Sequence, residues 1–172
     1  MAHNYIPKNE TTVFKIRSNG SSKILTFIAG LHVTNDGQFF DFLKNIFSFS
    51  KPEMLLVECP YTTSTTALRK SSKYEIMDEI AYMTRLAIEH GAKVNGMDEA
   101  YIRLRFLSPI EQETKRNERM IRRCISTLQK HDRILALAGH KHIREIRESL
   151  KNRIETAYGD VKVELLGDSA TC

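Results

Sequence analysis

Two short runs of residues that favour β-strands are separated by a turn sequence. Thr12–Arg17 alternates apolar and polar side chains, and Lys23–Ala29 is a second run of the same kind. Between them, Asn19 and Gly20 form a pair that readily adopts the positive φ angles of a tight turn. The pattern predicts a β-hairpin.

After the hairpin, helical and strand patterns alternate along the chain. Apolar residues recur at helical spacing from Gln38, and Lys51-Pro52 ends this helix before the apolar strand Met54–Val57. We expect Thr62–Ser72 to form a surface loop. Three further strands are predicted at Ala92–Met97, Arg133–Ala138 and Val161–Leu166.

Three more helices are predicted between these strands. Each has an apolar face that we expect to lie against the sheet, and Gly91 follows the first of them. The segment Tyr101–Thr114, which contains Pro109, is predicted to be irregular. The residues expected to face inward are Met77, Ile80, Ala81, Thr84, Ala87 and Ile88 in the first, Met120, Ile121, Cys124, Ile125 and Leu128 in the second, and Ile143, Ile146, Leu150 and Ile154 in the third.

This alternation predicts an α/β fold. Strands joined through helices are parallel to one another and are covered by helices on both faces of the sheet. We therefore expect a mostly parallel, mixed central sheet with an N-terminal β-hairpin, and a single domain over residues 1–172. The phenylalanines that cluster in the first helix are expected to pack in the core; they are Phe39, Phe40, Phe42, Phe47 and Phe49.

The composition is that of an ordinary globular protein, with 41% hydrophobic and 27% charged residues. No apolar run approaches the roughly 20 residues that span a bilayer, so we expect no membrane span. The first ten residues do not have the pattern of a secretory signal. The three cysteines show no disulfide or zinc-ribbon spacing, and together these features favour a reducing, cytoplasmic location.

The formal net charge is +5, and the positive charge is unevenly distributed. Tyr101–Arg153 holds 14 basic and 6 acidic residues, whereas the rest of the chain is slightly acidic. Such a surplus is compatible with an anionic partner, but it is also typical of the solvated faces of two amphipathic helices. No aromatic RNA-binding motif or zinc-finger spacing is present, so we do not expect a nucleic-acid partner.

Candidate chemical groups follow four of the predicted strands. His32, Glu58, the pair Asp98-Glu99 and His140 each come directly after, or within two residues of, an apolar run. Ligands of open α/β sheets bind beyond the carboxyl ends of the strands, where these side chains would gather. Imidazoles and carboxylates are suitable ligands for zinc, manganese, cobalt or iron, and they also serve as general bases.

Each of these residues also has a structural explanation. A histidine after a strand is often a surface or capping residue, and Asp98 or Glu99 can cap the next segment. Glu58 follows a buried strand directly, so its carboxylate needs a partner or a metal. Cys59 is an alternative nucleophile, although the neighbouring carboxylate disfavours its thiolate form. Phosphate-loop, dinucleotide-binding and nucleophile-elbow motifs are absent from the sequence.

Over Lys23–Leu150 the sequence resembles the TraB/Tiki superfamily, which includes TraB/PrgY-like proteins, ChaN-like haem-uptake proteins and erythromycin-esterase-like enzymes. The resemblance rests on His32, on LLVECP around Glu58, on GMDEA, on KRNERM and on ILALAGHKHI with His140. It also has departures, because Ala29 and Leu137 stand where the family has the first glycine of its G-x-x-H motifs.

The resemblance implies roles for particular residues. In the family an Arg-Asn pair lies three residues before a methionine and opens a helix, a pattern matched by Arg116, Asn117 and Met120. The resemblance implies that His32, Glu58 and His140 form the metal or catalytic group, and that Arg116 orients a carboxylate or an anionic intermediate.

We therefore expect a metal-dependent hydrolase that acts on a peptide or ester bond of a peptide or small-molecule substrate. The expected ligands of a divalent zinc, manganese or cobalt ion are His32, Glu58, Asp98 and His140, with Asp98 or Glu99 as fourth ligand or base. Arg116 would stabilise developing negative charge.

The alternative is a non-catalytic protein that binds a haem-like or anionic ligand at the same edge of the sheet. The sequence is compatible with a homo-oligomer. Residues 101–114 would be either a lid or an arm that grips a neighbouring subunit.

Overall fold

The computed structural model describes residues 12–30, 37–60, 79–98, 104–139 and 143–166. Its strands are β1 (Thr12–Ser18), β2 (Ile24–Gly30), β3 (Met54–Pro60), β4 (Lys93–Asp98), β5 (Arg133–Gly139) and β6 (Val161–Leu166). Its helices are α1 (Gly37–Ser50), α3 (Glu79–Glu89), α5 (Pro109–Leu128) and α6 (Ile143–Tyr158).

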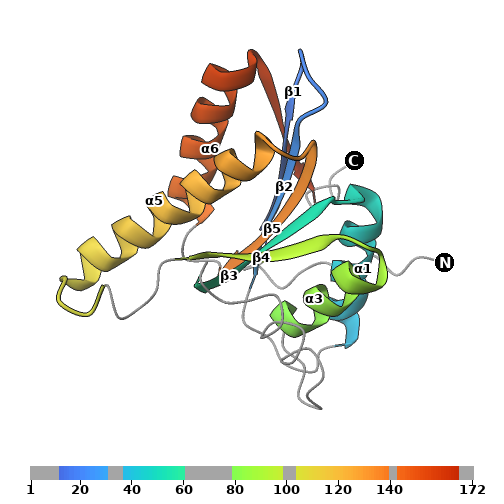
Figure 1. The fold of residues 1–172 in the computed structure, drawn as a ribbon, viewed down its shortest axis with the longest axis horizontal. Coiled ribbons are helices and arrows are strands. Elements are labelled where there is room, and N and C mark those ends of the chain that lie inside the picture. Colours follow the sequence, from blue (N-terminus) through green and yellow to red (C-terminus); the bar gives the residue numbers. More distant parts are fainter. Residues whose placement is uncertain (1–11, 31–36, 61–78, 99–103, 140–142, 167–172) are drawn as a thin grey trace, which may run out of the picture.

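The strands form one mixed sheet in the order β4-β3-β5-β2-β1-β6 (Figure 1). Neighbouring strands from β4 to β2 pair in parallel, whereas β1 pairs antiparallel with both β2 and β6. The predicted fold class is therefore confirmed: an α/β fold whose central sheet is mostly parallel, with an N-terminal hairpin formed by β1 and β2.

Helices cover both faces of this sheet. α5 and α6 pack on one face and α1 and α3 on the other, so each face has its own hydrophobic core. Successive strand residues face opposite layers, as Ile28 and Phe27 do, and this explains why the central strands have continuous apolar sequences. On the α5 side, the rings of Phe14 and Phe27 stack across the hairpin with centroids 5.1 Å apart.

The long helix starts earlier than the sequence pattern indicated. Tyr101–Thr114 was expected to be irregular, but α5 begins at Pro109. Ser108 caps the helix through the backbone N–H of Glu111, whose side chain in turn accepts from the Ser108 backbone. Proline is favoured at the first helical position, where its missing N–H costs nothing. Arg116 therefore lies two turns inside the helix rather than opening it.

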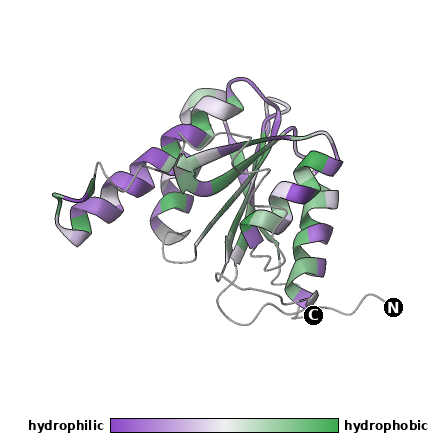
Figure 2. Cartoon of the chain, turned by 60° about the horizontal axis from the view of Figure 1, so that its bottom comes forward, coloured by the Kyte–Doolittle hydropathy of each residue, from purple (hydrophilic) through white to green (hydrophobic). Residues whose placement is uncertain are grey.

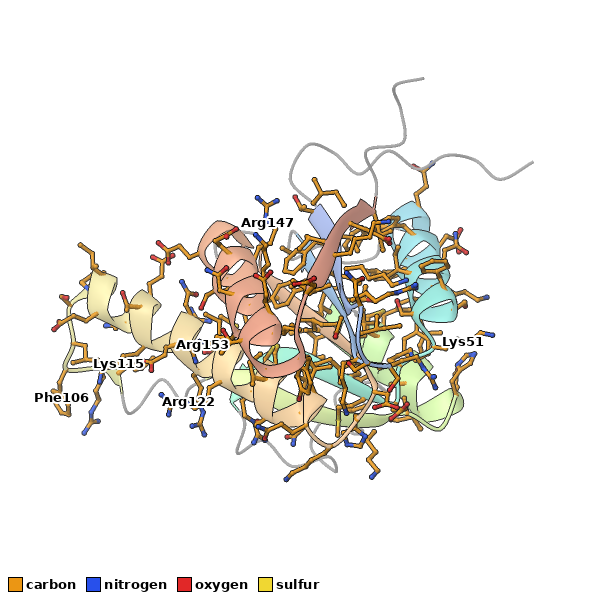
Figure 3. The ribbon with its side chains drawn as sticks, turned by 90° about the horizontal axis from the view of Figure 1, so that it is seen from above. Lys51, Phe106, Lys115, Arg122, Arg147 and Arg153 are labelled. Carbon is orange, nitrogen blue, oxygen red and sulfur yellow. The ribbon has the colours of Figure 1, made fainter. Side chains whose placement is uncertain are left out.

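The first half of α5 extends beyond the sheet. It lies at one end of the molecule in Figure 1, and in Figure 2 most of it is hydrophilic. Phe106, just before this helix, is 84% exposed and lies at its outer tip (Figure 3). No residue of α5 before Asn117 is buried. Further along, Met120, Ile121, Cys124 and Leu128 are buried as predicted, and Ile125 is partly buried.

Two side chains expected in the core are exposed. Phe49 is 63% exposed, because the buried stripe of α1 passes through Phe47 and Ser50 and leaves Phe49 beside it. Its ring instead lies 4.7 Å from the Nζ atom of Lys15. Ile88 is 36% exposed near the end of α3, while the unpredicted Met83 and Leu86 of that helix are buried.

Two other expectations fall on parts of the chain that the structure does not describe. The Thr62–Ser72 loop and Met77 both lie outside the described residues. Within the described ranges, no helix has the length and apolarity needed to cross a membrane.

Gly91, which follows α3, and Gly37, the first residue of α1, together test what a positive φ contributes to stability. Gly91 follows α3 with φ 73°, a conformation that costs other L-residues about 1–2 kcal/mol, whereas Gly37 has open space around it and no positive φ. We expect Gly91→Ala to lower the free energy of unfolding by about 1 kcal/mol and Gly37→Ala to leave it unchanged or slightly higher. Urea unfolding of both variants measures the difference, and equal stabilities would contradict this account.

Candidate functional site

Acidic side chains are brought together where parallel strands end. β2, β5, β3 and β4 all run in the same direction, so their carboxyl ends share one edge of the sheet. Asp98 is the last residue of β4, and Glu58 lies two residues before the end of β3. The two carboxylates therefore reach this edge from neighbouring strands.

A β-bulge interrupts β3 at the position of Glu58. Val57 pairs with Gly96 and Pro60 pairs with Asp98, so β3 uses one more residue than β4 over this step. Bulges of this kind bend a strand and change the direction of its side chains, and they are common beside active sites. The pattern of apolar residues in β3 contains no signal for the bulge.

Arg116 of α5 joins both carboxylates. Its Nε atom donates to Asp98 Oδ1 and Oδ2 at 3.2 and 2.9 Å, and its Nη2 atom donates to Asp98 Oδ2 at 2.5 Å. The same Nη2 atom donates to Glu58 Oε1 at 2.6 Å. A guanidinium is suited to this geometry because it presents several donors in one rigid plane.

The second carboxylate oxygen of Glu58 is held by the sheet itself. Oε2 accepts the backbone N–H of Gly139, the last residue of β5. One Glu58 carboxylate thus links the end of its own strand to the end of β5 and to α5. The two donors on its opposite oxygens fix the plane of the carboxylate.

The three charged groups are largely removed from solvent. The side chains of Asp98 and Glu58 are 7% and 9% exposed, and that of Arg116 is 33% exposed. The hydrogen bond to Asp98 raises the pKa of Arg116, although its burial acts in the opposite direction. Arg116 therefore stays protonated.

A second polar contact holds this part of α5 against α6. Asn117 is 5% exposed, and its Nδ2 atom donates to Glu145 Oε2 at 3.0 Å. Because Asn117 directly follows Arg116, this contact helps to fix the position of the guanidinium. Asn117 stands out in the sequence only through the family motif, and nothing in the sequence pattern points to Glu145 or to the Gly139 N–H.

The structure therefore brings together three of the predicted site residues: Glu58, Asp98 and Arg116. His32 and His140 lie outside the described residues, as does Glu99. The strands that precede the two histidines are neighbours, with Gly30 of β2 paired with Gly139 of β5. The catalytic and metal-binding roles assigned to all these residues stay predictions.

Among the described residues, no group of three or more histidine, cysteine, aspartate or glutamate side chains is arranged to hold a metal ion. The two carboxylates contribute oxygen donors at one edge of the sheet. Comparisons of the chain with family models, with curated proteins and with solved structures found no match.

The pairing of Arg116 gives a stability prediction. Arg116→Ala would remove the guanidinium that pairs with the buried carboxylates of Asp98 and Glu58, so we expect it to lower the free energy of unfolding by about 2–4 kcal/mol. Arg122→Ala on the same helix removes an exposed pair with Glu118 and should cost less than about 0.5 kcal/mol.

Both variants are to be compared by chemical denaturation at neutral pH. Asp98→Asn in the Arg116→Ala background should restore part of the loss, because it removes one of the two negative charges. Equal effects of the Arg116 and Arg122 substitutions would contradict the buried ion-pair account.

Proposed function

We propose that this edge of the sheet is a metal-dependent hydrolytic site that acts on a peptide or ester bond. The observation that supports it is the convergence of Glu58, Asp98 and Arg116, which come from β3, β4 and α5. These residues are 40 and 18 positions apart in the sequence, and each was expected at the site from the sequence. His32 and His140 complete the proposed site.

The charge of the described part favours a cation. Among the described side chains at this edge, two carboxylates face one guanidinium, a balance that favours a divalent cation over an anionic ligand. The alternative function is the binding of a haem-like or anionic molecule. Other contacts of that ligand would have to offset its repulsion by the two carboxylates. The local charge therefore supports the hydrolase over that alternative.

The donor set suits a divalent metal when the histidines are included. Glu58 and Asp98 would supply oxygen ligands, and His32 and His140 would supply nitrogen ligands, a mixture that zinc, manganese and cobalt accept. When bound, such an ion lowers the pKa of a water molecule and polarises the carbonyl of the substrate.

The protein's own groups have separate tasks in this proposal. Arg116 and the Gly139 N–H orient the Glu58 carboxylate as a metal ligand. Whichever of Asp98 and Glu99 is not the fourth ligand would take up the proton of the attacking water. Arg116 also fixes Asp98 through both of its carboxylate oxygens. Within the described part of the chain, the Nη1 atom of Arg116 has no hydrogen-bond partner, so it would donate to the oxyanion that develops on the substrate.

Metal binding is the direct test. We expect the purified protein to contain a divalent metal by mass spectrometry, or to bind zinc, manganese or cobalt in calorimetric titrations. Glu58→Gln, His32→Ala and His140→Ala should each weaken binding by at least about 10–100-fold, the loss typical of damaged metal sites.

The same strands provide matched controls at their opposite ends. Glu53 precedes β3 and His131 precedes β5. Glu53 Oε2 and His131 Nδ1 lie 3.7 Å apart at the amino end of these strands. Glu53→Gln and His131→Ala should leave metal affinity unchanged. Negligible metal binding by the wild-type protein, or equal losses in the control variants, would overturn the metal-dependent proposal.

Hydrolysis is tested separately with panels of peptide and ester substrates, with and without added metal. We expect activity that is lost on chelation and on the Glu58→Gln substitution but retained in Glu53→Gln. Metal binding at this site without hydrolysis of any member of either panel would contradict the enzymatic part of the proposal.

A further inference from the structure

The strand β6 ends the sheet opposite the candidate site. It pairs with β1 on one side, and within the described part of the chain no strand pairs with its other side. An edge of this kind presents unpaired N–H and C=O groups that can extend the sheet with another strand. β6 contains no proline, and Leu165 in it is 46% exposed.

The hydrogen-bond alternation of β6 shows which residues face outward. The Asn19 N–H donates to the Asp160 carbonyl at 2.8 Å, in the same register as the β1–β6 pairs. In an antiparallel ladder, every second residue bonds to the same neighbour, so Lys162 and Glu164 direct their backbone groups toward β1. Val161, Val163 and Leu165 therefore direct their N–H and C=O groups toward the open edge.

The sequence of β6 is self-complementary about Val163. When two copies pair antiparallel with Val163 opposite Val163, Lys162 of each copy lies opposite Glu164 of the other. On the other face of the strands, Val161 then lies opposite Leu165, an apolar pair at both ends. In this register Val163 pairs with Val163, and Val161 pairs with Leu165. The N–H and C=O groups that these three residues direct toward the open edge therefore all gain partners.

Neighbouring registers lack this match. Centring the pair on Lys162 places two lysines opposite each other, and centring it on Glu164 places two glutamates opposite each other. Like charges in direct opposition destabilise a strand pair. Of the registers centred on these three residues, only the one centred on Val163 opposes unlike charges.

Charges on β1 support the same register. Lys15 pairs with Glu164 and Arg17 pairs with Lys162 across the β1–β6 ladder. In the joined sheet, Glu164 would lie between Lys15 of its own chain and Lys162 of the second copy. Lys162 lies opposite the like charge of Arg17, and its Nζ atom lies 3.0 Å from Glu164 Oε1 of the same strand. In the joined sheet, each of these two side chains would also face the opposite charge of the second copy.

We propose that β6 is a homodimer interface, through which two copies of this chain form one continuous sheet with Val163 on the two-fold axis. A two-fold contact uses the same surface on both subunits, which a self-complementary strand satisfies. The partner is therefore a second copy of the chain.

Exchange of the two charges tests the interface and its register together. Sedimentation from about 1 µM to about 1 mM should show wild-type dimers. Lys162→Glu and Glu164→Lys, each alone, place like charges opposite each other and should weaken dimerisation at least about tenfold. The double variant Lys162→Glu/Glu164→Lys should dimerise again, and so should an equimolar mixture of the two single variants.

Lys115→Glu is the control, because it makes the same charge change on the projecting part of α5, far from β6 (Figure 3). Circular dichroism melting establishes that each variant is folded. A wild-type protein that is monomeric over the whole range would overturn the proposal. So would single variants that dimerise like the wild type, a mixture or double variant that stays monomeric, or a loss of dimer caused by Lys115→Glu.

Discussion

The carboxyl edge of the sheet is organised by the Arg116 guanidinium, which lies between two buried carboxylates. Parallel strands place their carboxyl ends side by side, and in this protein two of those ends carry Asp98 and Glu58. Two carboxylates at 7% and 9% exposure would repel each other and would lose their hydration. Arg116 compensates for both losses, and it does so from a helix on the α5–α6 face of the sheet. The arrangement of the site and the packing of α5 therefore depend on the same contacts of Arg116.

This constraint explains features that are otherwise unrelated. The bulge in β3 lies at Glu58, and the Gly139 N–H donates to the Glu58 carboxylate. Asn117 and Glu145 hold the middle of α5 against α6 close to the guanidinium. A lysine at position 116 could not bridge both carboxylates in the same way, because its single ammonium lacks the planar array of donors.

Much of this fold could be predicted because its signals are local. The apolar strands and Gly91 each specify their own segment, and the alternation of strands and helices implies a parallel sheet. The hairpin lies where Asn19-Gly20 predicted it, although neither residue has the positive φ expected of the pair. The start of α5 was not predicted because proline usually interrupts a helix, whereas Ser108 and Glu111 make Pro109 the first residue of one. The capping sequence was present, and proline is favourable at the first helical position.

The site was only partly predictable, for a physical reason. The sequence shows which strands end in acidic residues, and the parallel topology then brings Glu58 and Asp98 to the same edge of the sheet. It does not show the pairing of Arg116 with both, because that depends on the angle at which α5 crosses the sheet. The bulge at Glu58 and the Asn117–Glu145 contact are likewise consequences of tertiary packing and leave no periodic pattern.

The candidate site and the proposed dimer interface lie at different places on the sheet. The site involves the ends of β4, β3 and β5, while β6 is separated from β5 by β2 and β1. A sheet extended through β6 would leave the two sites on its outer strands, with neither covered by the other copy. Dimerisation would then act on stability and not on the composition of the site. The charge balance at Arg116 and the charge match at β6 are thus independent properties of the same sheet, and failure of one proposal would leave the other unchanged.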